Sequence, residues 1–172
     1  MYRSPNEDEI IRDVLSRAPT NIKEMISRLG LVYVERPMED GLSGAIDFDG
    51  LQYVISVNEA EAEQRKRFTA AHELAHYLLH RDLMKERRHL DRLFDEAANR
   101  NPTEPLTYQH EMQANQFAAR LLMPKATIES EIAKENDTIE GLAQTFGVSR
   151  QAMEYRLANL GLANKIRDLA EA

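Results

Sequence analysis

The sequence predicts an α+β fold, in which a small antiparallel or mixed sheet packs on one long helix and a helical segment follows. Three observations lead to this prediction. Two apolar stretches flank Asp49-Gly50, a dipeptide typical of β-hairpins. A long helical pattern comes next, over residues 59–80. Residues 126–172 then show helical patterns separated by turn signals.

The individual elements follow from local signals. A first helix is expected to begin at Ser4-Pro5, because serine caps a helix and proline suits its first position. A second helix over residues 20–29 should end at Gly30. Short strands are expected at residues 31–35, 45–48 and 51–57. Apolar residues alternate in the last of these, from Leu51 to Val57, so one face should be buried.

The second half of the chain is predicted to be helical. The highly charged residues 81–100 are expected to form a solvated helix, and residues 108–123 a more apolar one that is broken at Pro124. Three or four further helices should follow. We therefore place a domain boundary between residues 1–125, which hold the sheet and the long helix, and residues 126–172, a helical segment expected to pack on them.

Composition limits the class of protein. Of the 172 residues, 42% are hydrophobic and 30% are charged, enough for one folded domain with a small helical appendage. The chain has no cysteine, which excludes disulfides, thiolate metal sites and a cysteine nucleophile. A formal net charge of −7 argues against nucleic acid as the main partner. Since neither an apolar leader nor a membrane-length apolar run is present, we expect a cytoplasmic protein with no membrane partner.

Residues 72–76 read His-Glu-Leu-Ala-His, a spacing with specific chemistry. Residues four apart on a helix share one face and lie about 6 Å apart along its axis, so His72 and His76 can hold one metal ion. Glu73 points partly toward the same site and can reach a metal-bound water without binding the metal. This is the arrangement of a metallohydrolase, with two ligands and a general base.

A catalytic zinc site usually has a third protein ligand. His80 is about 12 Å from His72 along the helix axis, too far for both to share an ion with His76, so we expect it to pack or to hydrogen-bond. Glu111 lies near the buried side of the next apolar helix, where small residues allow close approach to a neighbour. On geometry alone, Glu111 and His110 are competing candidates.

Two longer motifs resemble the core of the ImmA/IrrE family of metallopeptidases. Residues 67–80 read RFTAAHELAHYLLH, and residues 111–124 read EMQANQFAARLLMP. The family shows R-F-T-x-A-H-E-x-x-H, followed by E-x-x-A-N-x-F-A-x-x-L-L-M-P. The resemblance extends over about residues 45–162, and two long motifs in the right order make it specific.

The resemblance implies a zincin-like fold with a gluzincin-like metal site. His72 and His76 match the two histidine ligands, Glu111 the third ligand and Glu73 the catalytic glutamate. Family members often carry a second glutamate at the position of Gln113, and its replacement here leaves Glu111 as the candidate ligand. Zinc is the default metal for this donor set, with manganese or iron as alternatives.

The mechanism expected from these residues is metal-dependent peptide hydrolysis. Glu73 would take a proton from water and later deliver it to the leaving amine. A further donor should stabilise the oxyanion, and Tyr108, His110 and His89 are candidates among which the sequence does not choose. By analogy with zincin folds, the strand at residues 51–57 is expected to hold an extended substrate along its edge.

Residues 138–153 have the pattern of a helix-turn-helix pair, with Gly147 in the turn and Ser149 capping the second helix. One interpretation is DNA binding through the start of that second helix. However, residues 138–172 contain four basic and four acidic residues, whereas dedicated DNA-binding domains are usually basic. We therefore favour packing or protein recognition for this segment.

Together these observations predict a zinc metallo-endopeptidase. By resemblance, its substrate would be a specific protein, such as a helix-turn-helix transcriptional repressor encoded nearby, whose cleavage relieves repression. A variant of this hypothesis is the toxin-like half of a two-gene module. Other classes remain open, namely a DNA-binding regulator whose metal site is structural or vestigial, and a non-catalytic protein-binding module.

Overall fold

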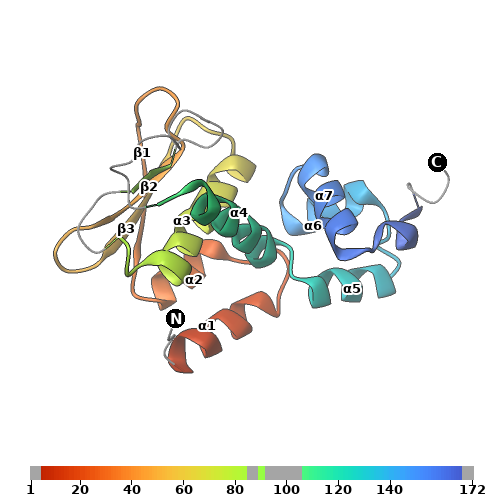
Figure 1. The fold of residues 1–172 in the computed structure, drawn as a ribbon. Coiled ribbons are helices and arrows are strands. Elements are labelled where there is room, and N and C mark those ends of the chain that lie inside the picture. The colour runs from red at the N-terminus through yellow and green to blue at the C-terminus, as the bar shows by residue number, and fades with distance from the viewer. Residues whose placement is uncertain (1–4, 85–88, 92–105, 168–172) are drawn as a thin grey trace.

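The computed structural model describes residues 5–84, 89–91 and 106–167, and it has the α+β architecture that the sequence predicts. In Figure 1, the sheet lies at one end of the molecule and α5 to α7 at the other, with α3 and α4 between them. The elements in chain order are α1 (Pro5–Leu15), α2 (Ile22–Arg28), β1 (Val32–Arg36), β2 (Gly44–Phe48), β3 (Tyr53–Asn58), α3 (Glu63–His80), β4 (His89–Asp91), α4 (Tyr108–Leu122), α5 (Lys125–Ala133), α6 (Ile139–Phe146), α7 (Arg150–Leu160) and a short 3-10 helix (Ala163–Lys165).

The four strands are arranged in the order β1-β3-β2-β4. β1 runs parallel to β3, whereas β2 is antiparallel to both β3 and β4. Ile55 and Val57 of β3 are fully buried, as the alternation predicts. Because β3 lies between β1 and β2, both of its edges are already paired. The prediction that this strand holds a substrate along a free edge is therefore wrong.

The β2–β3 hairpin forms at Asp49-Gly50, but its turn extends further than the sequence predicts. The Asp49 carboxylate accepts hydrogen bonds from the backbone N–H groups of Gln52 and Leu51, at 2.9 and 2.8 Å, and these bonds lower its pKa. Gly50 takes a positive φ of 99°, which suits glycine. Leu51 therefore belongs to the turn, where it is 84% exposed instead of buried.

The charged stretch after α3 also differs from the prediction of a helix. Residues 89–91, predicted as part of a helix, form the strand β4, in which His89 pairs with Ile46 and Asp91 with Gly44. Residues 81–84 form a turn, and the rest of the stretch lies outside the described residues. Pairing with β2 is a tertiary contact, which overrides the helical tendency of a charged run.

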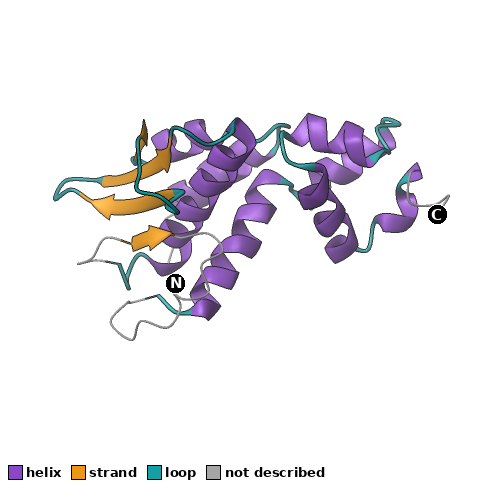
Figure 2. Ribbon diagram, turned by 90° about the horizontal axis from the view of Figure 1, so that it is seen from above, coloured by secondary structure: helices purple, strands orange, loops and turns teal. Residues whose placement is uncertain are grey.

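The helices form layers on the sheet. Figure 2 shows the strands at one end of the molecule, with helices packed beside them. α3 packs on β2 and β3, α2 packs on β1, and α4 lies against α3. α3 begins at Glu63, four residues later than expected, and ends at His80 as expected. Among the described residues, no helix has the length and apolar character that a membrane span needs. Small side chains let α3 and α4 approach closely, and the fully buried ones are Ala71, Ala75, Ala114 and Ala118.

The C-terminal helices contact both α3 and α4. Arg67 of α3 donates from Nη2 to the carbonyl oxygens of Thr20 and Phe146, each at 3.2 Å. Arg156 of α7 donates from Nε to the carbonyl oxygen of Met123, at 3.0 Å. Burial lowers the pKa of both guanidinium groups. A single apolar core includes residues from α2, the sheet, α3, α4, α6 and α7.

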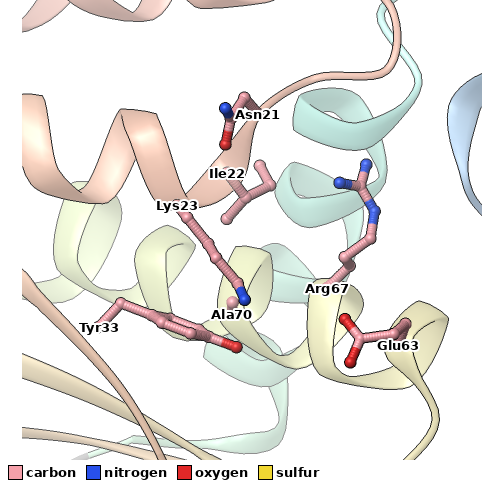
Figure 3. A pocket seen from close by; sticks show the side chains of 7 residues that line it. All are labelled: Asn21, Ile22, Lys23, Tyr33, Glu63, Arg67 and Ala70. Atoms are coloured by element: carbon pink, nitrogen blue, oxygen red, sulfur yellow. The ribbon is translucent and has the colours of Figure 1, made fainter.

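A cavity of about 120 Å³ lies beside Arg67, between α2, β1 and α3 (Figure 3). Residues 63, 67 and 70 line it from one face of α3. With 3.6 residues per turn, positions 72 and 76 lie on the opposite face. The cavity is therefore separate from the histidines of the His-Glu-Leu-Ala-His motif. Its lining residues are Asn21, Ile22, Lys23, Tyr33, Glu63, Arg67 and Ala70.

We predict that Arg67→Ala lowers the free energy of unfolding by about 2 kcal/mol, because two carbonyl groups lose a charged hydrogen-bond donor. Urea denaturation measures this loss. Arg120→Ala, at an exposed position on α4, is the matched control and should change stability little. If the Arg67→Ala and Arg120→Ala variants are equally stable, the hydrogen bonds of Arg67 do not stabilise the packing of α3 against its neighbours.

Candidate metal centre

Two helices supply the candidate site. Contacts between α3 and α4 run from His72 against Asn115 at one end to His80 against His110 at the other, so the helices are antiparallel. The geometry of an α-helix puts His72 and His76 one turn apart on the α4-facing side of α3. Glu111, in the first turn of α4, reaches both of them.

Three ligand atoms converge on one point. The Nε2 atoms of His72 and His76 are 2.9 Å apart. Glu111 Oε2 lies 3.2 Å from Nε2 of His72 and 3.4 Å from Nε2 of His76. Donors bound at about 2.0–2.1 Å to a tetrahedral zinc ion are about 3.3 Å apart, so the three separations match one shared ion. The structure therefore brings Glu111, rather than His110, to the two histidines.

Burial fits this interpretation. The side chains of His72 and His76 have no solvent exposure, whereas that of Glu111 is 19% exposed. Three acceptor atoms this close together repel one another unless a cation or a proton lies between them. Two imidazoles and one carboxylate are the protein ligands of many catalytic zinc sites, which keep a fourth position for water. The donor set and its spacing therefore suit a divalent metal.

Asn115 orients the first histidine, a contact that the sequence analysis missed. Its Oδ1 lies 2.9 Å from His72 Nδ1. When the Nδ1–H of His72 donates to this oxygen, Nε2 keeps a lone pair for a metal. The spacing of the two residues could have indicated this contact, because residue 115 lies four positions after Glu111 and therefore on the same face of α4.

Glu73 lies on the side of α3 that faces the sheet and has no solvent exposure. A Cβ atom added to Gly44 of β2 would lie 3.4 Å from Glu73 Oε1 and only 2.3 Å from Cγ2 of Thr69. The absence of a side chain at Gly44 therefore lets β2 approach α3 beside Glu73. Among the described residues, the group that can hold a metal consists of His72, His76 and Glu111, without Glu73.

The candidates for an oxyanion donor occupy different surroundings. Tyr108 is the first residue of α4 and is 58% exposed. His110 accepts from the backbone N–H of Thr107 through Nδ1, at 3.0 Å, and so helps to cap α4. Its Nε2 then carries the proton and can donate. His89 lies in β4, and its side chain is outside those described.

Comparison with known proteins agrees with this fold and site. The family model Peptidase_M78, described as the IrrE N-terminal-like domain, matches residues 26–158. The chain belongs to this family, and membership supports a metallopeptidase-type function with metal binding. A comparison with curated protein sequences finds no match.

A solved structure shows the same fold. It is a Mycobacterium tuberculosis transcriptional regulator with a TM-score of 0.58 and 18% sequence identity. The match covers 91% of this chain and 48% of the regulator, so the chain spans about half of that protein's length.

We predict that Gly44→Ala lowers the free energy of unfolding by about 2 kcal/mol, because the new methyl group overlaps the Thr69 side chain. Thr69→Ser removes the overlapping Cγ2, so Gly44→Ala combined with Thr69→Ser should lose less stability than the two single changes added together. Urea denaturation of the three variants measures this coupling. Additive losses would show that β2 does not approach α3 as closely as described.

Proposed function

We propose that the protein is a zinc-dependent endopeptidase in which His72, His76 and Glu111 hold the metal. The main support is the convergence of their three ligand atoms at separations of 2.9–3.4 Å. Membership of the Peptidase_M78 family supports the same conclusion. Manganese or iron is chemically compatible with this donor set, but zinc is the usual ion for two histidines and one carboxylate.

The chemistry that we propose uses residues of this chain around the metal. When bound, zinc would supply Lewis-acid activation of a water molecule and of the peptide carbonyl group. Glu73 takes the proton from the attacking water and delivers it to the leaving amine nitrogen. Its burial beside Gly44 supports this role, because little bulk water competes for the proton. Tyr108 or the Nε2–H of His110 is the proposed oxyanion donor.

We propose a specific protein as the substrate, in particular a helix-turn-helix transcriptional repressor encoded nearby. The peptidase family supports a protein substrate. The similar fold of a protein named as a transcriptional regulator supports a regulatory context. The lack of cysteine is compatible with action in a reducing cytoplasm.

We further propose that residues 1–125 form the peptidase domain and residues 126–172 a helical segment that packs on it rather than binding DNA. Most basic side chains of this segment are used within the protein. Arg150 pairs with Glu154 at 2.9 Å, and Arg156 donates to the Met123 carbonyl. Arg167 pairs with Asp137 at 2.7 Å, which leaves little free positive charge for a phosphate backbone.

We predict that the wild-type protein binds about one zinc ion per chain and that Glu111→Gln and His76→Ala weaken this binding at least tenfold. Glu73→Gln should retain the zinc yet lose peptidase activity, because it removes the general base and spares the ligands. Elemental analysis and chelator competition measure the metal. Co-expression with the repressors encoded nearby, followed by terminal sequencing of fragments, measures cleavage.

Glu140→Gln is the matched control, since it neutralises an exposed glutamate away from the site. It should match the wild type in zinc content and in cleavage. The proposal fails if the wild type takes up no transition metal after reconstitution, or if Glu73→Gln cleaves as fast as the wild type.

A further inference from the structure

A second set of contacts leads away from the candidate metal site, through His80. This histidine is buried, with 4% exposure, at the last position of α3. Its Nδ1 lies 3.1 Å from Nδ1 of His76, and its Nε2 lies 2.9 Å from Oε1 of Gln113. A continuous chain of hydrogen bonds therefore joins a ligand of the proposed metal to an exposed amide on α4.

The positions of the protons along this chain follow from elementary hydrogen-bond rules. An amide oxygen can only accept, so the Nε2–H of His80 donates to Gln113 Oε1. In a neutral imidazole, the other nitrogen of His80 is then an acceptor. It takes the hydrogen bond from the Nδ1–H of His76. His76 is left with its lone pair on Nε2, the atom that faces His72 and Glu111.

We propose that Gln113 and His80 are positioning residues that set the tautomer and the ring orientation of His76 for metal binding. This inference rests on the proposed function of the site. The two histidine ligands are thus oriented in different ways. His72 bonds directly to the amide of Asn115, whereas His76 is held through an intervening histidine.

Packing restrains the intervening ring. The ring of His110 lies 4.8 Å from that of His80, measured between centroids. His110 is itself held by the hydrogen bond from the Thr107 backbone at the start of α4. The ring of His80 is therefore confined between α3 and the first turn of α4, which keeps both of its nitrogens directed at their partners.

The direction of these hydrogen bonds depends on how the side-chain amide of Gln113 is oriented. If the side-chain amide of Gln113 is reversed, its NH₂ group donates to His80, and every hydrogen bond along the chain changes direction. The proton on His76 then moves to Nε2 and blocks the ligand atom. A carboxylate can only accept, so a glutamate at position 113 would permit only the productive direction. Gln113→Glu should therefore strengthen metal binding.

The test compares the zinc dissociation constants of full-length variants by chelator competition. His80→Ala should weaken zinc binding about 10- to 100-fold, and Gln113→Ala about tenfold, as expected for groups that orient a ligand. Gln113→Glu should bind zinc more tightly than the wild type. Gln116→Ala and Gln116→Glu make the same changes at an exposed position on α4 and should leave the affinity unchanged.

Nitrogen-15 NMR of the zinc-loaded protein identifies the protonated ring nitrogens directly, at a pH well above the ordinary pKa of histidine. We expect His76 to be protonated at Nδ1 and His80 at Nε2, and Gln113→Ala to open the Nε2–H of His80 to exchange with solvent. A role for Gln113 in packing alone would not change these signals. The thermal unfolding temperature of each variant shows whether it is folded, and exposed Gln113 should tolerate substitution.

The outcomes separate the two proposals. If the wild type binds one zinc ion and the His80 and Gln113 variants bind it equally well, the positioning role is wrong and the metal site stands. His80 protonated at Nδ1 in the wild type would also overturn the positioning role. If the wild type binds no zinc, both proposals fail.

Discussion

The close antiparallel contact between α3 and α4 is the constraint on which the rest of the structure depends. Two of the converging ligand atoms belong to α3 and the third to α4, so a displacement of one helical turn, about 5.4 Å, would separate them. Fully buried alanines on both helices permit the approach. On the other side of α3, the absence of a side chain at Gly44 lets β2 approach the helix. The helix that carries both histidines is thus held from two sides.

The helices beyond α4 add a further restraint. Arg67 connects α3 to the end of α6, and Arg156 connects α7 to the end of α4. The C-terminal segment therefore touches both helices that supply the site. Near the site itself, Asn115 contacts one histidine and His80 the other. Because burying unpartnered polar groups is costly, such contacts help to keep imidazole rings inside a protein interior in one orientation.

Much of this arrangement can be predicted from sequence, since it depends on local spacing. The pairing of His72 with His76 follows from helix periodicity, and the α3 and α4 helices form close to the predicted residues. The partner of the histidines could not be derived in the same way, because the choice between Glu111 and His110 depends on how two helices meet. The order of the strands is also non-local. For this reason the sequence wrongly predicts a substrate-binding edge at β3 and a helix at the residues of β4.

The central claim is that one metal ion is shared by His72, His76 and Glu111. Anomalous X-ray diffraction at the zinc absorption edge, on crystals of the zinc-loaded protein, tests it most directly. We expect a single strong peak bonded to both Nε2 atoms and to the Glu111 carboxylate, at about 2.0–2.2 Å. A peak bonded instead to the Nδ1 atoms of His76 and His80, or one without Glu111 as a ligand, would contradict the claim.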